Sequence, residues 1–389
     1  MSEMVDGNAL TLLESGRQYF PALEAACDEA QREIHLETYI FEDDVAGRRI
    51  ADALVRAAQR GVATHVLVDG YGSKTLSSRI VGEFKEAGVR FLVYRPDIAP
   101  WRSPRQRLRR MHRKLAVIDA RIAFVGGINV IDDMHTPGHT PPRFDYAVQV
   151  EGPLLEYIHP AARRLWMIAQ LTQLGGGWPD LDDESEPDVA RRGHQRAAFL
   201  VRDNLWHRND IEEAYLSAIA QALLEILIAS SYFFPGLGFR HALAQAAARG
   251  VRVVLLLQGR VEYRLLHDAS RALYGTLLDA GIEIHEYHKS FLHAKVAVID
   301  RTWATVGSSN IDPLSLLLAR EANVVVEDPQ FAEDLITSLQ AAIDGGAEQV
   351  RAENWRKRPF PARVAHWACY GLARLLTGLS AYGQAQEFA

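Results

Sequence analysis

The sequence predicts an α/β protein of two similar lobes, each a mostly buried mixed sheet flanked by helices, with an active site at the lobe interface. Three observations predict this fold. Short apolar runs alternate with helical patterns in both halves of the chain. The 389 residues are too many for one ordinary core but suit two. A polar motif of fixed spacing also occurs once in each half.

The elements follow the same order in both halves: strand, helix, strand, helix, strand, and then the strand that carries the motif. Each series starts with an apolar run that reads as a buried strand, from Ile34 to Phe41 and from Ile226 to Phe233. Four helical patterns then end in a glycine, which suits the C-terminal end of a helix. These glycines are Gly61, Gly88, Gly250 and Gly281.

We predict that the two lobes span residues 1–174 and 196–350. Residues 175–195 are acidic, rich in Gly and Pro and without periodicity, which is typical of an exposed linker. A helical pattern from Ile211 to Glu225 is expected to open the second lobe.

Residues 351–389 form a basic, amphipathic C-terminal segment. On a helix, one side of this segment is an apolar stripe and the other side carries His366, Tyr370, Arg374 and Thr377. The stripe consists of Val364, Trp367, Ala368, Gly371, Leu375 and Leu379. Two interpretations stay open: the stripe packs on the protein's own core, or it meets anionic lipid headgroups as a membrane-interfacial helix.

The composition is that of an ordinary globular protein, with 48% hydrophobic and 24% charged residues. Cys27 and Cys369 show neither metal-ligand nor redox spacing. The N-terminus carries acids without a following apolar run, and no 18-residue apolar stretch occurs. We therefore expect neither secretion nor a spanning helix. The net charge of −6 argues against a general nucleic-acid binder, so no nucleic-acid partner is expected.

The repeated motif has the form His-x-Lys-x-x-x-x-Asp, at His112, Lys114 and Asp119 and again at His293, Lys295 and Asp300. Asn129 and Asn310 follow the two aspartates at the same distance, ten residues on. Because side chains alternate along a strand, the His and Lys of each motif project from one face, and the intervening Arg113 points away.

Two histidines can perform a substitution at a phosphodiester phosphorus, one as nucleophile and one as general acid and base. The two lysines would neutralise the phosphate oxygens, and Asn129, Ser308 and Asn310 would donate hydrogen bonds to them. The lysines supply the charge that a metal would bring, and no carboxylate cluster has ligand spacing. We therefore expect no metal and no other cofactor.

By this doubled motif the chain resembles the phospholipase D superfamily. Three further segments are similar to bacterial cardiolipin synthases of the short B type. They are Arg202-Asp203-Asn204, Tyr232-Phe233-Phe234-Pro235-Gly236 and Asn310-Ile311-Asp312-Pro313-Leu314-Ser315. The resemblance implies that Asp119 and Asp300, although part of the catalytic motif, have a structural role. Asp145 and Glu321, which open strands after the Asn-bearing turns, are the candidates to orient the histidines, with a surface salt bridge as the alternative.

The resemblance further implies phosphatidyl transfer to form cardiolipin, with phosphatidylglycerol and phosphatidylethanolamine as substrates to test and a phosphohistidine intermediate. The enzyme would lie peripherally on the cytoplasmic side of the bacterial cell membrane. Alternatives are a phospholipase D-type hydrolase, a nuclease and an inactive membrane-binding scaffold. A basic run from Arg102 to Arg121 favours an anionic substrate. The alternative interpretation is that this run is only a solvated loop. We assign His112 as nucleophile and His293 as acid and base, with the reverse left open. Oligomeric state is not predicted.

Overall fold

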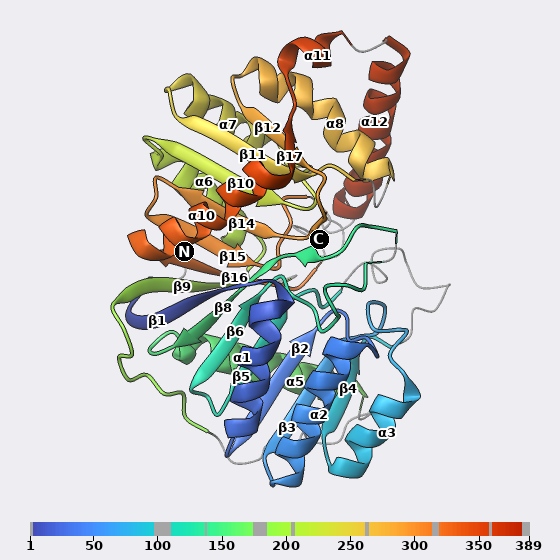
Figure 1. Cartoon of the computed structure of the whole chain (residues 1–389), viewed down its shortest axis with the longest axis vertical. Coiled ribbons are helices and arrows are strands. Elements are labelled where there is room, and N and C mark those ends of the chain that lie inside the picture. Colours follow the sequence, from blue (N-terminus) through green and yellow to red (C-terminus); the bar gives the residue numbers. More distant parts are fainter. Residues whose placement is uncertain are drawn as a thin grey trace.

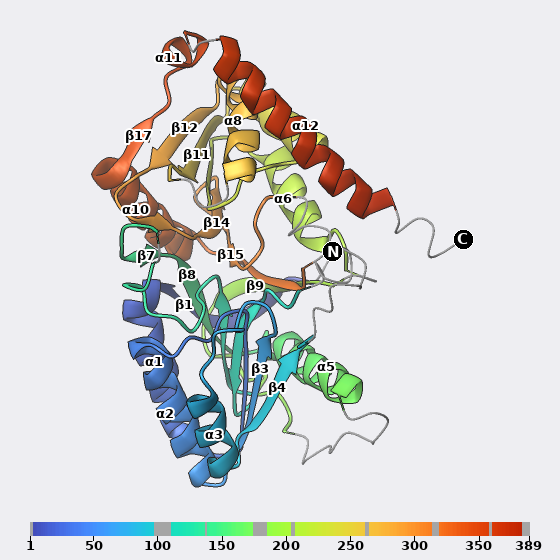
Figure 2. The ribbon, with the colours of Figure 1, turned by 90° about the vertical axis from the view of Figure 1, so that its right-hand side faces the viewer.

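The computed structural model describes residues 3–96, 110–136, 138–173, 185–203, 207–260, 264–312, 319–357 and 360–382. Within these residues, a 15-stranded sheet continues from one lobe into the other. Helices cover both faces of this sheet, and the two lobes lie one above the other in Figures 1 and 2. The predicted α/β fold class is confirmed.

The first lobe is formed by the N-terminal half of the chain and occupies the lower, blue-to-green part of Figure 1. Its strands are β1 (Val5–Glu14), β2 (Glu33–Thr38), β3 (Ala63–Asp69), β4 (Arg90–Tyr94), β5 (Lys114–Ile118), β6 (Ile122–Gly126), β7 (Arg143–Phe144) and β8 (Tyr146–Glu151). Its helices are α1 (Ser15–Glu29), α2 (Val45–Gln59), α3 (Ser78–Ala87) and α5 (Leu155–Gln173).

The second lobe forms the upper part of Figure 1. Its strands are β9 (Gln195–Arg202), β10 (Glu225–Ser230), β11 (Arg252–Gln258), β12 (Glu283–Tyr287), β13 (Phe291–Leu292), β14 (Lys295–Ile299), β15 (Trp303–Gly307), β16 (Glu321–Glu327) and β17 (Ala347–Gln349). Its helices are α6 (Asp210–Gln221), α7 (Leu237–Ala248), α8 (Arg264–Asp279), α10 (Pro329–Gly346), α11 (Ala352–Arg356) and α12 (Phe360–Tyr382).

The two lobes repeat the same strand order. The first runs β1-β8-β6-β5-β2-β3-β4 and the second β9-β16-β15-β14-β10-β11-β12, to which β17 adds at the outer edge. Each lobe has three parallel strands, β2, β3 and β4 in the first and β10, β11 and β12 in the second. The motif strand, β5 or β14, pairs antiparallel with the first of these strands and begins the antiparallel part of the sheet. The lobes join where β1 and β9 pair antiparallel. Motif strands at equivalent places therefore flank one interface.

The hydrophobic core also crosses the boundary between the lobes. One cluster of buried residues lies under α5 and α10 and includes Val150 of β8, Ala197 of β9 and Val326 of β16. Two further clusters each cover the other face of one lobe. The lobes therefore share buried apolar surface, and their relative placement rests on packing as well as on the chain connection.

The glycines expected to end helices do so. Gly61, Gly88, Gly250 and Gly281 follow α2, α3, α7 and α8, and all four have φ between 83° and 92°. A residue with a Cβ is strained in this left-handed conformation, which glycine adopts at little cost.

Some predicted boundaries were wrong. The helix expected from Ile211 to Glu225 is α6, which ends at Gln221, and Glu225 already starts β10. Strand β1 and helix α1, which precede the first repeated strand, were not predicted. Of the expected linker, residues 185–194 contain no helix or strand, and residues 175–184 lie outside the described part of the chain.

Asp119 and Asp300 occupy the same place in the two lobes, at the turn after the motif strand. Asp119 accepts hydrogen bonds from the backbone N–H groups of Gln31, Arg32 and Glu33, at 2.8 to 3.0 Å. Asp300 accepts three from Leu223, Leu224 and Glu225, at 2.7 to 3.0 Å. Each aspartate therefore fixes the entry into the neighbouring strand, β2 or β10.

We predict that Asp300→Ala lowers the free energy of unfolding by about 2 kcal/mol, because three backbone donors lose a charged acceptor and Ala disfavours the φ of 51° at this position. Asp300→Asn should lose less, since Asn tolerates positive φ and keeps an oxygen acceptor. Urea unfolding measures both. An Asp300→Ala variant as stable as the wild type would contradict this structural role.

Candidate active site

The two motif histidines lie immediately before β5 and β14, where short backbone pairings connect the lobes. The N–H of His112 donates to the carbonyl of Arg320 at 2.9 Å, beside the bridge between Met111 and Arg320. The N–H of His293 donates to the carbonyl of Phe144 at 2.8 Å, next to the parallel pair of β7 and β13. Each histidine backbone is thus bonded to the opposite lobe.

The side chains are crossed in the same way. Nδ1 of His112 lies 3.0 and 3.1 Å from the two carboxylate oxygens of Glu321, at the start of β16. Nδ1 of His293 lies 2.6 Å from Oδ2 of Asp145, between β7 and β8. Among the described residues, neither Nε2 atom has a hydrogen-bond partner in the structure. A carboxylate on Nδ1 fixes the tautomer in which Nε2 presents a lone pair.

Both motif lysines are buried beside their own histidine. Nζ of Lys114 donates to the carbonyl of His112 at 2.5 Å and lies 5.3 Å from the ring centre of Tyr39. Nζ of Lys295 lies 3.0 Å from Nδ1 of His293 and 3.8 Å from Oδ2 of Asp145. Two ammonium groups therefore stand beside the two imidazoles.

Burial and these charges shift the titration of the site. Burial lowers the pKa of His112, against the raising effect of Glu321. Burial, together with Lys295 and Arg143, lowers the pKa of His293 well below its usual range. Burial also lowers the pKa of Lys114 to about 7. Both imidazoles are consequently neutral near neutral pH, the form in which a ring nitrogen can attack.

The two carboxylates are not equivalent. Burial raises the pKa of Asp145 to about 6, with Lys295 and the N–H of Tyr146 opposing the rise. For Glu321, burial opposes ionisation, but His112, Lys114 and Ser308 outweigh it, and the pKa of this carboxyl is lowered. Glu321 is therefore the more firmly ionised of the two partners.

A small difference between the repeats accompanies this asymmetry. A Cβ at Gly127 would lie 2.3 Å from Oδ1 of Asp145, so only glycine fits there. The equivalent residue, Ser308, donates its hydroxyl to Glu321 at 2.5 Å. The expectation that Ser308 donates to a phosphate is corrected here, because a hydroxyl has one proton and the carboxylate receives it.

Asn129 and Asn310 are buried next to these turns. Oδ1 of Asn129 accepts from the N–H of Ile40 at 3.0 Å, and Oδ1 of Asn310 accepts from the hydroxyl of Ser231 at 3.0 Å. A bond from either side chain to a phosphate oxygen has to come from the amide nitrogen.

Asp119 and Asp300 do not reach the reacting groups. Each stands five residues beyond its motif lysine, which is roughly 16 Å along an extended strand. Their carboxylates are bound to backbone, as described above. Asp119 and Asp300 therefore belong to the catalytic motif but not to the reacting groups, and their contacts agree with the structural role that the resemblance implies.

The basic run before His112 is only partly described. Arg102, Arg105, Arg107 and Arg109 lie outside the described residues. Arg113 is buried and points away from the site, as expected, where its guanidinium bonds Glu37 and the carbonyl of Ala161. Because Glu37 neutralises it, Arg113 is not available to an anionic substrate.

Asp69, at the end of β3, is a further residue of the site that was not predicted from the sequence. Its carboxylate is buried and accepts a hydrogen bond from the N–H of Met111 at 2.9 Å, and further bonds from Tyr71 and Gly72. Asp69 thereby holds the segment that leads into His112. The sequence signal that could have identified Asp69 is its position directly after the apolar run Val66-Leu67-Val68.

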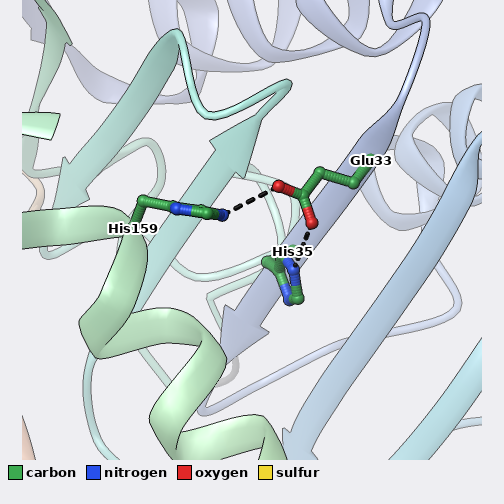
Figure 3. A group of neighbouring side chains, drawn as sticks. All are labelled: Glu33, His35 and His159. Carbon is green, nitrogen blue, oxygen red and sulfur yellow. Dashed lines mark hydrogen bonds and ion pairs between the residues drawn. The ribbon is translucent and has the colours of Figure 1, made fainter. Parts of the chain in front are cut away.

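A second missed group is Glu33, His35 and His159, whose side chains meet in the interior of the first lobe, between β2 and α5 (Figure 3). Their donor atoms are of the kind that bind metal ions. Spacing could not reveal this group, because His159 lies 124 residues after His35 (159 − 35 = 124). The alternation Glu33-Ile34-His35 was the only local signal.

The chain is similar to known proteins over most of its length. A family model described as "Cardiolipin synthase, PLD-like domain" matches residues 23–136 and 215–343, one stretch in each lobe. Cardiolipin synthase B of Escherichia coli (strain K12) is 44% identical over 367 residues, covering 91% of this chain and 85% of that protein. Cardiolipin synthase of Halalkalibacterium halodurans is 30% identical over 375 residues, covering 94% and 72%.

Two solved structures share the fold at low sequence identity. Phosphatidylserine synthase of Haemophilus influenzae Rd KW20 has a TM-score of 0.66 at 15% identity and covers 95% of this chain and 94% of that one. Polyphosphate kinase of Porphyromonas gingivalis has a TM-score of 0.58 at 16% identity, covering 96% and 53%.

The family model covers both repeats, and the relatives align over nearly the whole chain. This chain therefore belongs to the cardiolipin synthase family of phospholipase D-like enzymes.

Proposed function

We propose that the protein is a phosphatidyl transferase that makes cardiolipin from phosphatidylglycerol and a second phospholipid or alcohol acceptor, through a phosphohistidine intermediate. The observation that carries the proposal is the crossed arrangement of the two imidazoles, each held through Nδ1 by a carboxylate of the opposite lobe. The names of the relatives, cardiolipin synthases at 44% and 30% identity, support the choice of substrate class.

In the first step, Nε2 of His112 attacks phosphorus, and the bond from phosphorus to the headgroup oxygen breaks. The imidazole becomes positively charged as it is phosphorylated, and the ionised Glu321 on Nδ1 stabilises that charge. The leaving oxygen takes its proton from Nε2 of the form of His293 that carries a proton on both ring nitrogens, and it departs as the headgroup alcohol, so that His293 is left neutral. Because the pKa of His293 lies well below the usual range, this doubly protonated form is a strong acid.

In the second step, the acceptor hydroxyl gives its proton to His293, its oxygen bonds to phosphorus, and the bond to His112 breaks. Lys114, Lys295 and the amide nitrogens of Asn129 and Asn310 would neutralise the non-bridging oxygens in both steps. Water in place of the alcohol would turn the same site into a phospholipase D-type hydrolase. The acceptor therefore decides between transfer and hydrolysis.

The C-terminal helix α12 supports work at a lipid surface. His366, Cys369, Tyr370 and Ala373 form the face that packs against the second lobe. Of the stripe predicted from the sequence, Val364, Trp367 and Leu375 are 49% to 58% exposed, and the neighbouring Leu372 is 47% exposed. The side chain of Leu379 lies outside the described part of the chain. Figure 2 shows α12 along one side of the second lobe.

The packed face agrees with the interpretation that α12 belongs to the core, and the open face leaves room for the proposed contact with lipid. No helix in the described part of the chain is long and apolar enough to cross a bilayer. An exposed apolar face preceded by Arg356-Lys357-Arg358 fits a peripheral contact with anionic lipid.

The product profile tests the proposed reaction. Purified protein in mixed micelles of phosphatidylglycerol and phosphatidylethanolamine should form cardiolipin and release the headgroup alcohol, while phosphatidic acid stays a minor product. Mass spectrometry of the lipids measures both. Phosphatidic acid as the main product would replace transfer by hydrolysis, and cleavage of DNA without lipid turnover would favour the nuclease.

The crossed pairs lead to a prediction about the intermediate. With a short-chain donor that has a good leaving group, His293→Asn should still form the covalent adduct, whereas His112→Asn should abolish it. Glu321→Gln, although in the lobe of His293, should slow adduct formation by about 10²- to 10⁴-fold, because it weakens support of the His112 imidazolium.

Acid-quenched mass spectrometry of the phosphorylated peptide measures these rates. Asp145→Asn is the matched control, since it removes the partner of His293 and should spare adduct formation from an activated donor. An adduct mapped to His293 would reverse the two roles, and an unchanged rate in Glu321→Gln would contradict the function of the crossed contact.

A further prediction concerns the outer face of α12. Replacing Trp367 and Leu375 together by Glu should weaken binding to anionic vesicles at least about 10-fold, because two apolar side chains no longer enter the lipid. Both residues are at least half exposed, so the melting temperature should stay unchanged. Flotation with phosphatidylglycerol vesicles is the measurement.

The control for this variant is Leu223→Glu with Leu224→Glu, two leucines that are 79% and 67% exposed before β10. They should not affect vesicle binding. Equal binding by the α12 variant and the wild type, or equal losses in both variants, would speak against α12 as the lipid contact.

A further inference from the structure

We propose that Glu33, His35 and His159 form a structural binding site for a divalent transition metal ion of the zinc class, between β2 and α5 of the first lobe. This site lies apart from the two motif histidines. None of its residues belongs to the reaction proposed above, and the inference stands independently of that reaction.

The geometry of the three side chains suits one cation. Glu33 and His35 project from the same face of β2, because they are two residues apart on a strand. Nε2 of His35 lies 3.1 Å from Oε2 of Glu33, and Nε2 of His159 lies 2.8 Å from Oε1 of the same carboxylate. Figure 3 shows both rings directed at that carboxylate from different elements.

These distances match those between ligands of one ion. Imidazole nitrogens and carboxylate oxygens bind zinc at about 2.0 to 2.2 Å, which sets neighbouring donor atoms roughly 3 Å apart. With both oxygens of Glu33 bound, the three residues offer four donor atoms, the number usual for zinc. A mixed set of imidazole and carboxylate ligands suits zinc and related ions better than magnesium or calcium.

Burial makes a cation favourable there. The exposed fractions are 6% for Glu33, 4% for His35 and 2% for His159. Nε2 of His35 and Nε2 of His159 are the side-chain partners of the Glu33 carboxylate among the described residues. A divalent ion bound between the three side chains would neutralise this buried carboxylate and take the place of the protons that the side chains share.

The second lobe provides an internal comparison. In the first lobe, His35 pairs with His65 across β2 and β3, and the equivalent pair in the second lobe is Leu227 with Val254. His159 comes 14 residues after Asp145, and Leu335 comes 14 residues after Glu321 (159 − 145 = 335 − 321).

Leu227, Val254 and Leu335 are all buried in the shared core. The fold thus fills these three positions with aliphatic side chains where no ligand is needed. The first lobe has His35, His65 and His159 at these positions, and two of the three contact the carboxylate of Glu33. The fold alone does not require histidines there.

A bound ion would fix α5 to the sheet below His112. The same face of β2 continues to Glu37, which pairs with Arg113, and Arg113 also donates to the carbonyl of Ala161 on α5. The metal and the arginine would then hold one helix at two neighbouring points. The expected consequence of metal binding is stability of the first lobe, with no change in the chemical step.

The test uses the full chain, freed of metal by dialysis against a chelator and then titrated with Zn²⁺. Calorimetry should find one high-affinity equivalent, and excess Zn²⁺ should raise the melting temperature by roughly 5 °C. Co²⁺ on the wild type should give the visible absorption of a tetrahedral nitrogen and oxygen site, a readout that needs no variant.

His159→Leu, which copies Leu335 of the second lobe, and His35→Leu, which copies Leu227, should each weaken Zn²⁺ binding by at least about 100-fold. The matched control is His285→Ala in Glu283-Ile284-His285, the same tripeptide as Glu33-Ile34-His35. There the histidine stands 3.7 Å from Glu283 in a pair that is partly exposed.

His285→Ala should bind Zn²⁺ as the wild type does. Circular dichroism establishes that each variant is folded. The site is refuted if the wild type binds no Zn²⁺ and shows no Co²⁺ spectrum, or if folded His159→Leu and His35→Leu bind as the wild type does. Loss of binding in His285→Ala alone would assign the ion to the second lobe and refute the proposal equally.

Discussion

The site depends on the crossed contacts between imidazole and carboxylate across the lobe interface, His112 with Glu321 and His293 with Asp145. Neither lobe alone contains both a motif histidine and the carboxylate that bonds it. A continuous sheet through β1 and β9 and a core shared by α5 and α10 set the lobes in register. Rigid placement of this kind matters because a charge-assisted hydrogen bond weakens steeply when its partners separate.

The near symmetry of the lobes does not extend to their electrostatics. Ser308 and Lys114 help keep Glu321 ionised beside His112, whereas burial raises the pKa of Asp145 to about 6 beside His293. Gly127, in the position equivalent to Ser308, brings no hydroxyl to Asp145. Two copies of one motif therefore acquire different electrostatic environments, which suits the proposed division of roles between a nucleophile and an acid.

The lobes also differ away from the interface. Where the second lobe buries Leu227, Val254 and Leu335, the first buries His35, His65 and His159 around Glu33. The second lobe in turn carries α12, which packs on α8 through one face and exposes apolar side chains on the other. The hydroxyl of Tyr370 on α12 also accepts a hydrogen bond from Arg240 of α7. The ring of Tyr370 on α12 contacts the ring of Phe234. Phe233, the preceding residue, pairs with Ile311, so α12 lies against a loop that is close to Asn310.

The sequence by itself determined the repeated order of elements, the glycines that end the helices, and the pairing of His with Lys on one strand face. These features depend on local backbone geometry and alternation, which a sequence displays directly. It also named Asp145 and Glu321, but which acid meets which histidine was decided only by the tertiary structure. The same holds for the end of α6 at Gln221, for Ser308 bound to Glu321, and for His159 beside Glu33. The side-chain contacts among these join residues that are from 13 to 209 positions apart in the sequence. Tertiary packing determines which residues meet, and the distance between them along the sequence does not reveal it.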